Sequence, residues 1–211
     1  MQHKTIALNK SITRYIFVAL ILLIAHASAF AQKASFGARA GLNFANITFT
    51  GYPDGVNVSS KAGLDIAAFM EYNVSKNVSI VPELGLVAYG ANADYEGVVN
   101  SKIKTSYIQL PVLVKYRFNN GISLAAGPQL AFLLKGEQKD DDSEKEDIKK
   151  YLKKTDIMLT FGAGYEFSNG FGIGLRYNAG LIDIYDADIP GLSAKNHSFG
   201  IHLSYRLAPR K

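Results

Sequence analysis

The chain has 211 residues, with no Cys and no Trp, 19 Gly, 12 Tyr and 12 Phe, and a formal net charge of +5. The lack of Cys excludes disulfide and thiolate chemistry, and the length suits one β-rich domain with a sizeable core. Three basic residues lie before residue 32, so the rest of the chain carries 20 basic and 18 acidic residues. No basic stripe with interleaved aromatics then remains to neutralise phosphates, and nucleic-acid binding is not expected.

The N-terminus has the composition of a secretory signal peptide. Three basic residues precede an apolar run over residues 15–25, and the Ala29-x-Ala31 motif fits cleavage before Gln32. The apolar run is shorter than the roughly 18 residues that a spanning helix needs, which disfavours a membrane anchor. We therefore expect residues 1–31 to be a cleaved signal peptide and residues 32–211 to form the mature domain, which passes through the periplasm.

Segments of period-two hydrophobicity recur after the cleavage site. The clearest is Ser106–Phe118, where every second residue from Ile108 onward is apolar, while Gln109, Lys115 and Arg117 lie between them. This is the pattern of a strand, and it is long enough to cross a bilayer, which takes about 9–11 residues of tilted strand. The sequence predicts eight such strands, over residues 36–44, 64–73, 80–89, 106–118, 122–134, 156–167, 171–181 and 198–207.

The connections between these segments alternate in length. Tight turns follow the second, fourth and sixth segments, and long polar loops follow the others: Ile47 to Lys61, Ala91 to Thr105, Lys135 to Lys154, and Asp183 to Asn196. The third of these is the most charged, so a solvated loop is expected there, with a helical turn from Glu144 onward. No other apolar run reaches helical spanning length. The alternation therefore predicts a closed antiparallel up-and-down transmembrane β-barrel, with the long loops outside and the short turns in the periplasm.

Two sets of residues fit such a barrel. Aromatic residues gather on the apolar face near the short turns, as in a membrane-interface girdle: Phe36, Tyr72, Tyr116, Phe118, Tyr165, Phe167, Phe171 and Tyr205. The polar faces carry equal numbers of basic and acidic residues: Arg39, Lys115, Arg117, Arg176 and Arg206 with Asp65, Glu71, Glu83, Asp156 and Glu166. Isolated charges are costly inside a narrow barrel, so we expect these to pair. An eight-stranded barrel has room for its own side chains or one small ligand, so we predict a filled polar lumen and not an open diffusion pore.

The order and spacing of several motifs resemble the PorT-like outer-membrane β-barrel family common in Bacteroidota. The motifs are Tyr107–Tyr116, Gly127-Pro128, Phe161–Phe167 and Gly174–Asn178, and the likeness covers about residues 34–207. The resemblance implies an eight-stranded barrel in the cell outer membrane. The founding member serves a secretion and motility apparatus, a role that barrel similarity alone does not transfer.

The leading hypothesis is a structural or interaction protein, embedded in outer-membrane lipid and presenting its long loops to the environment or to a protein partner. The partner and the oligomeric state are left open, with a monomer favoured. The alternative is a secreted soluble barrel that holds a small apolar ligand, as lipocalins do. Such a barrel would turn the apolar face inward and would give the rim aromatics no reason to gather.

Catalytic, metal and cofactor sites are not expected. His202 and Ser204 share a face, and acidic residues at 183–188 precede them, but nothing in the spacing favours a Ser-His-Asp triad. The acidic run at 140–144 lacks the positions of a calcium loop. The Gly-x-Gly pairs of the sixth and seventh segments lie inside strands with no helix after them, unlike nucleotide-binding loops.

Overall fold

The computed structural model describes residues 34–51, 56–95, 99–140, 144–186 and 193–207. The expected signal peptide and its cleavage site lie outside these residues. Among the described residues, no helix is long and apolar enough to cross a membrane.

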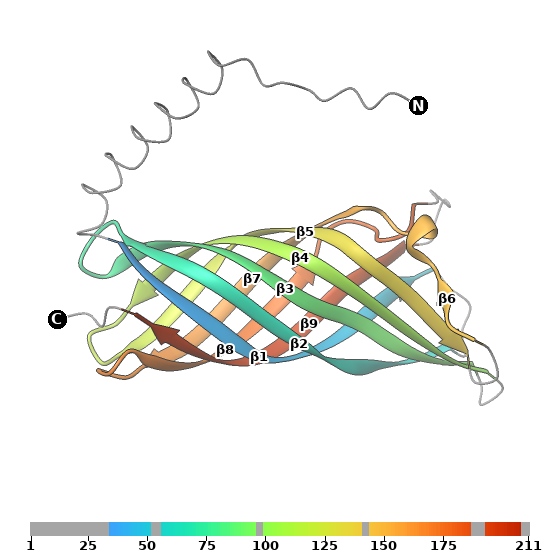
Figure 1. Ribbon diagram of the computed structural model, residues 1–211, viewed down its shortest axis with the longest axis horizontal. Helices are drawn as coiled ribbons and strands as arrows, with labels where there is room; N and C mark the ends of the chain where they lie inside the picture. Colours follow the sequence, from blue (N-terminus) through green and yellow to red (C-terminus); the bar gives the residue numbers. More distant parts are fainter. Residues whose placement is uncertain (1–33, 52–55, 96–98, 141–143, 187–192, 208–211) are drawn as a thin grey trace, which may run out of the picture. The chain divides into compact units, whose positions relative to one another are not determined.

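Eight long strands close into a barrel. With one two-residue strand, they are β1 Ala34–Thr50, β2 Val56–Asn73, β3 Val78–Tyr95, β4 Val99–Arg117, β5 Ile122–Asp140, β6 Glu146–Asp147, β7 Thr155–Glu166, β8 Phe171–Gly180 and β9 Ser193–Arg206. The order β4-β3-β2-β1-β9-β8-β7-β5 is completed by pairing of β4 with β5, so the ring has no free edge (Figure 1). The prediction of an all-β, eight-stranded antiparallel barrel is confirmed.

Short turns join β2 to β3, β4 to β5, and β7 to β8 at what we call the short-turn end, at the left of Figure 1. Gly121 and Gly170 have φ values of 89° and 88° in two of these turns, a conformation that favours glycine. In both turns the preceding Asn accepts, through its side-chain oxygen, a hydrogen bond of 3.2 Å from the backbone N–H two residues on. The local sequence thus sets the geometry of these turns.

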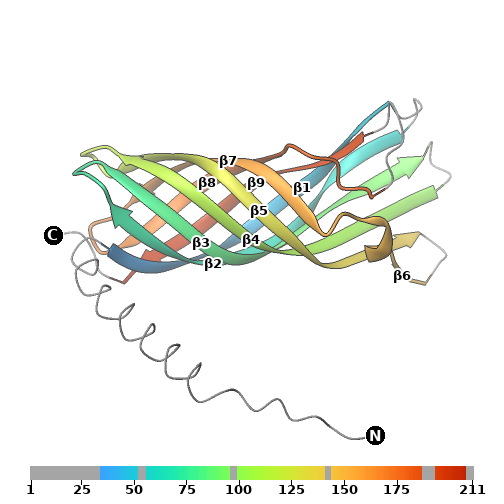
Figure 2. The same cartoon turned by 90° about the horizontal axis from the view of Figure 1, so that it is seen from above.

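At the opposite end, which we call the long-connection end, the strands continue well beyond the predicted segments (Figure 2). The predicted loop Ile47 to Lys61 is mostly strand, because β1 ends at Thr50 and β2 begins at Val56. The predicted loop Ala91 to Thr105 is likewise mostly the ends of β3 and β4. These loop predictions were wrong in extent, since a strand with polar residues on its outer face still satisfies its backbone groups by pairing.

The predicted solvated loop Lys135 to Lys154 is also largely ordered structure. Strand β5 continues to Asp140, β6 pairs with β5, and the 3-10 helix η1 spans Lys149–Tyr151. The helical turn expected from Glu144 onward is therefore present as this short 3-10 helix. In the fourth predicted loop, Asp183 to Asn196, β9 begins at Ser193.

Candidate functional site

The ten charged residues predicted for the lumen all lie on the inner faces of the strands. Eight of them are buried, with at most 8% of their surface exposed, and the side chains of Lys115 and Glu166 are 19% and 14% exposed. Their alternate neighbours face outward; Leu84, for example, is 58% exposed beside Glu83 at 7%. The period-two pattern of the sequence is therefore the pattern of the barrel wall.

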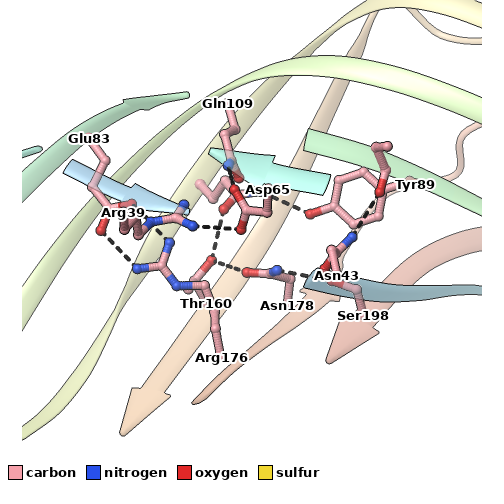
Figure 3. A network of polar contacts seen from close by, with 12 residues as sticks. Arg39, Asn43, Asp65, Glu83, Tyr89, Gln109, Thr160, Arg176, Asn178 and Ser198 are labelled. Atoms are coloured by element: carbon pink, nitrogen blue, oxygen red, sulfur yellow. Dashed lines mark hydrogen bonds and ion pairs between the residues drawn. The ribbon is translucent and has the colours of Figure 1, made fainter. Parts of the chain in front are cut away.

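A central ion-pair cluster joins Arg39, Asp65, Glu83 and Arg176 (Figure 3). Arg39 contacts Asp65 at 2.6 Å and Glu83 at 2.8 Å. Arg176 donates two hydrogen bonds to Glu83, at 2.9 and 2.8 Å, one to each carboxylate oxygen. Gln109 donates to the other oxygen of Asp65. Glu83 on β3 and Arg176 on β8 come from opposite sides of the ring, so their contact crosses the lumen.

A second ion-pair cluster lies closer to the short-turn end. Glu71 contacts Arg117 at 2.7 Å and Lys115 at 3.0 Å. Arg117 also contacts Glu166 at 2.5 Å, and Arg206 pairs with the same Glu166 carboxylate. Charge-assisted hydrogen bonds of this kind are the strongest that side chains make. The cluster ties β2, β4, β7 and β9 together across the interior.

Asp156 stands apart from both clusters. Its Oδ2 accepts a hydrogen bond of 2.8 Å from Asn196, and its Oδ1 has no hydrogen-bond partner among the described residues. The two clusters therefore contain five basic residues and four carboxylates. The equal counts read from the sequence do not correspond to one neutral network.

A layer of neutral polar side chains follows the central cluster toward the long-connection end. Gln129 donates to the Tyr89 hydroxyl and to the sulfur of Met158, each at 3.3 Å. Thr160 donates to Asn178 at 2.8 Å, and Asn178 in turn donates to Ser198 at 3.0 Å. Tyr89, Gln129 and Met158 are almost fully buried, so this layer leaves little access for water. Figure 3 shows Tyr89, Thr160, Asn178 and Ser198 of this layer beside the central cluster.

Beyond this layer the interior becomes apolar, which sequence reasoning missed. A buried cluster combines residues from the strand ends with residues from the connections, and it comprises Ala45, Ile47, Val87, Tyr89, Ala91, Ile103, Tyr107, Ala131, Leu133, Ile148, Leu152, Met158, Ile184 and Ala194. Ile148 and Leu152 flank η1, and the Lys153 N–H donates to the Ile184 carbonyl at 2.8 Å. We call this whole cluster the apolar plug; Ile148, Leu152 and Ile184 are its residues from the connections.

The sequence carried a signal for the apolar plug. In β1 the apolar residues occupy even positions up to Phe44 and then odd positions at Ala45 and Ile47, without any interruption of the strand. The odd positions stay on the buried face along the whole strand, so the change of phase means that the inward face turns from polar to apolar after Phe44. The same change occurs in β4, where Ile103 and Tyr107 point inward.

The predicted girdle residues lie on the outer face at the short-turn end. Seven of the eight are exposed, with Phe36 the most exposed at 57%. Three pairs of rings are in contact, with centroids 4.8–4.9 Å apart: Tyr116 with Phe118, Tyr165 with Phe167, and Phe171 with Tyr205. Tyr72 is partly buried.

The side chains considered for catalysis are not brought together. Asp183 accepts the backbone N–H groups of Tyr185 and Ala194 and so holds the connection before β9. His202 lies eight residues after Ala194 along β9. Eight residues of strand span about 26 Å, so His202 is far from Asp183. Within the described residues, no group of three His, Cys, Asp or Glu side chains is placed to hold a metal ion. Residues 141–143 of the acidic run lie outside the description.

Among the described residues, spaces remain near the short-turn end. One, of about 90 Å³, is lined by residues that include Arg39, Glu83 and His202. Another, of about 400 Å³, lies at the mouth of the barrel and is lined by residues that include Arg117 and Phe167. Glycines in the wall make room for inward side chains, since a Cβ added to Gly174 would lie 2.5 Å from the His202 ring.

The chain matches one family model and is similar to several solved structures. The model of a family described as outer membrane protein beta-barrel domain matches residues 30–186. Among solved structures, the chain is similar to Ail, the attachment invasion locus protein of Yersinia pestis, in complex with the heparin analogue sucrose octasulfate (14% identity, 83% of this chain and 99% of that chain, TM-score 0.44). It is also similar to Neisserial surface protein A (14% identity, 82% and 97% coverage, TM-score 0.48) and to OprG of Pseudomonas aeruginosa (11% identity, 82% and 96%, TM-score 0.46). No curated protein matches the chain.

Proposed function

Because the chain belongs to the outer membrane protein beta-barrel domain family, we propose that it is a non-enzymatic scaffold of the outer membrane. Its barrel is embedded in lipid, its lumen is closed to diffusion, and its long-connection end faces outward, where a protein partner can bind. The observation that carries this proposal is the contrast between the two faces of the wall. Large apolar side chains such as Val114 and Leu203 are exposed, while charged ones are buried and paired. Only a lipid surrounding makes that contrast favourable.

The contents of the lumen support a closed barrel. Along its length, two ion-pair clusters, a neutral polar layer and the apolar plug follow one another. Each of the two clusters contains an ion pair between strands that are not neighbours in the ring. The paired side chains therefore cross the lumen and occupy its interior. An open diffusion pore would need a continuous water-filled path, as in barrels of many more strands.

The soluble lipocalin-like alternative is not supported, because it requires the aliphatic face to point inward. That face is exposed on every long strand, with Leu64 at 67% and Leu203 at 64%. A soluble monomer rarely exposes contiguous apolar patches of more than a few hundred Å². The girdle residues fit an interface anchor at the short-turn end, where amphipathic rings prefer to lie.

Three finer assignments belong to the same proposal. We place the chain among the PorT-like barrels of Bacteroidota on the likeness of Tyr107–Tyr116 and the motifs after it. We take residues 1–31 as a cleaved signal peptide, and a monomer as the membrane form. The lumen charges serve the fold, since their hydrogen bonds join strands far apart in the ring.

The test combines localisation with conductance. The protein from a membrane fraction is first run on a detergent gel with and without boiling, where a folded barrel migrates differently in the two samples. Folded protein is then reconstituted in planar bilayers and in vesicles that report swelling in sugar solutions. We expect a heat-modifiable band, no steady conductance and no swelling. Recovery only from the soluble periplasm would refute the membrane assignment, and steady single-channel conductance would refute the closed lumen.

A further inference from the structure

Five lysines gather on the outer surface where the barrel wall passes from apolar to polar. They are Lys61 on β2, Lys102 and Lys104 on β4, and Lys135 and Lys139 on β5, and we call them the lysine patch. All are exposed except Lys61, which is partly buried. Lys102 and Lys104 are close enough to Lys61 to repel its charge.

The strand register brings these side chains together. Lys104 pairs with Gly90 on one side and with Glu137 on the other, and Lys102 pairs with Asn92 and Lys139. A Cβ added to Gly90 would lie 3.0 Å from Cδ of Lys61, so the Lys61 stem lies across this glycine toward β4. Gly90 is buried beneath this stem, and the absence of a side chain there lets Lys61 lie close to the wall.

The lysine patch has an excess of positive charge. Glu137, which lies between Lys135 and Lys139 on β5, pairs with Lys135 at 2.7 Å. Asp94 lies farther out on β3, and on β6 the acidic residues Asp147 and Glu146 pair in register with Glu137 and Gln138, on the side of β5 away from β4. Four lysines therefore face outward without an ion pair to a carboxylate among the described residues.

The position of the lysine patch relative to the apolar band points to its ligand. Leu64, 67% exposed, is three residues from Lys61 along β2, and the exposed Leu134 immediately precedes Lys135 on β5. The patch lies on the outer face of the wall, and it extends from the apolar band at Lys135 toward the end of β5 at Lys139. A headgroup at this level can keep its chains against the apolar band while its phosphate meets the lysines.

We propose that the lysine patch binds the phosphate groups of anionic lipid headgroups in the leaflet at the long-connection end. The inference rests on the proposed embedding of the barrel in lipid. It adds a lipid partner of stated chemistry and fixes the height of the barrel in the bilayer on this side. Lysine suits this role, because it binds phosphate as a compact charge on a flexible stem that packs along apolar surface.

The experiment measures lipid selectivity of the whole folded protein. Spin-labelled phosphatidylglycerol and phosphatidylcholine are compared in vesicles of phosphatidylcholine, at low and high salt, for the wild type and for Lys61→Gln/Lys102→Gln/Lys104→Gln. The matched control is Lys145→Gln/Lys150→Gln/Lys154→Gln, which removes three exposed lysines of 144–154. A heat-modifiable band checks folding of each variant, and the single variant Lys104→Gln replaces the triple variant if the latter does not fold.

We expect the wild type and the control to prefer phosphatidylglycerol, and the patch variant to lose about fivefold or more of that preference. High salt should reduce the preference in the wild type. Equal selectivity in the patch variant and the control, or no preference in the wild type, would overturn the proposal. So would binding of a soluble sulfated polysaccharide by the detergent-solubilised protein without any lipid preference. A protein that forms a heat-modifiable, non-conducting barrel but shows no preference would retain the proposed function and lose only this inference.

Discussion

The central ion-pair cluster gives the sharpest test of what holds the lumen together. Glu83 accepts three hydrogen bonds, one from Arg39 at 2.8 Å and two from Arg176 at 2.9 and 2.8 Å, and its side chain is only 3% exposed. In Glu83→Gln the shape is kept and the charge is lost. Arg39 still contacts Asp65, but Arg176 is left as a buried cation without a carboxylate among the described residues. Removing one partner of a buried pair costs about 3–5 kcal/mol, so we expect that decrease in the free energy of unfolding.

The assay is unfolding by urea in lipid vesicles, with the folded fraction read from the gel shift because the chain has no Trp. Lys154→Gln is the control, since it removes an exposed charge outside the lysine patch and should leave the midpoint unchanged. Glu83→Gln/Arg176→Met also removes the uncompensated cation, so it should be less destabilised than Glu83→Gln alone. If Glu83→Gln were as stable as the control, or if the double variant lost the sum of both single effects, the ion pairs would not have the role argued here.

Three further predictions concern other parts of the chain. Gly174→Val should lower the folded fraction on the gel, because its Cβ would lie 2.5 Å from the His202 ring, whereas Gly162→Ala, with its nearest neighbour 3.6 Å away, should fold normally. Leu152→Ala should cost about 2–5 kcal/mol locally, seen as faster proteolysis of residues 144–154 with an unchanged gel shift; unchanged proteolysis would contradict the apolar plug. Mass spectrometry of the protein from membranes should find Gln32 at the N-terminus, and an intact leader would refute the signal peptide.

The sequence could predict which side chains face the lumen, because successive residues of a strand point to opposite faces and each residue therefore has only two possible directions. Once Leu110 is taken as outward, Gln109 must point inward, and no tertiary information is needed. Which charges meet could not be predicted in this way. Glu83 meets Arg176 because the stagger of the closed ring brings β3 and β8 to the same level from opposite sides. Asp156 and Glu166 lie on the same inner face of β7, and the sequence predicted an ion pair for each. They are ten residues apart, so Asp156 lies away from both clusters and accepts a hydrogen bond from Asn196 instead.

The failure to predict the strand ends has a single physical cause, the change of solvent along the wall. Within lipid the favourable arrangement is apolar outside and polar inside, whereas beyond the headgroups water lies outside and the interior must be apolar to exclude it. A strand that crosses this boundary must exchange the composition of its two faces, as β1 does after Phe44 and β4 does after Tyr107. A search for strands with apolar outward residues stops where the composition of the faces is exchanged, and it assigns the rest of the strand to a loop. The point of exchange therefore indicates where the lipid ends, and on β4 the lysine patch begins at Lys104, three residues beyond it.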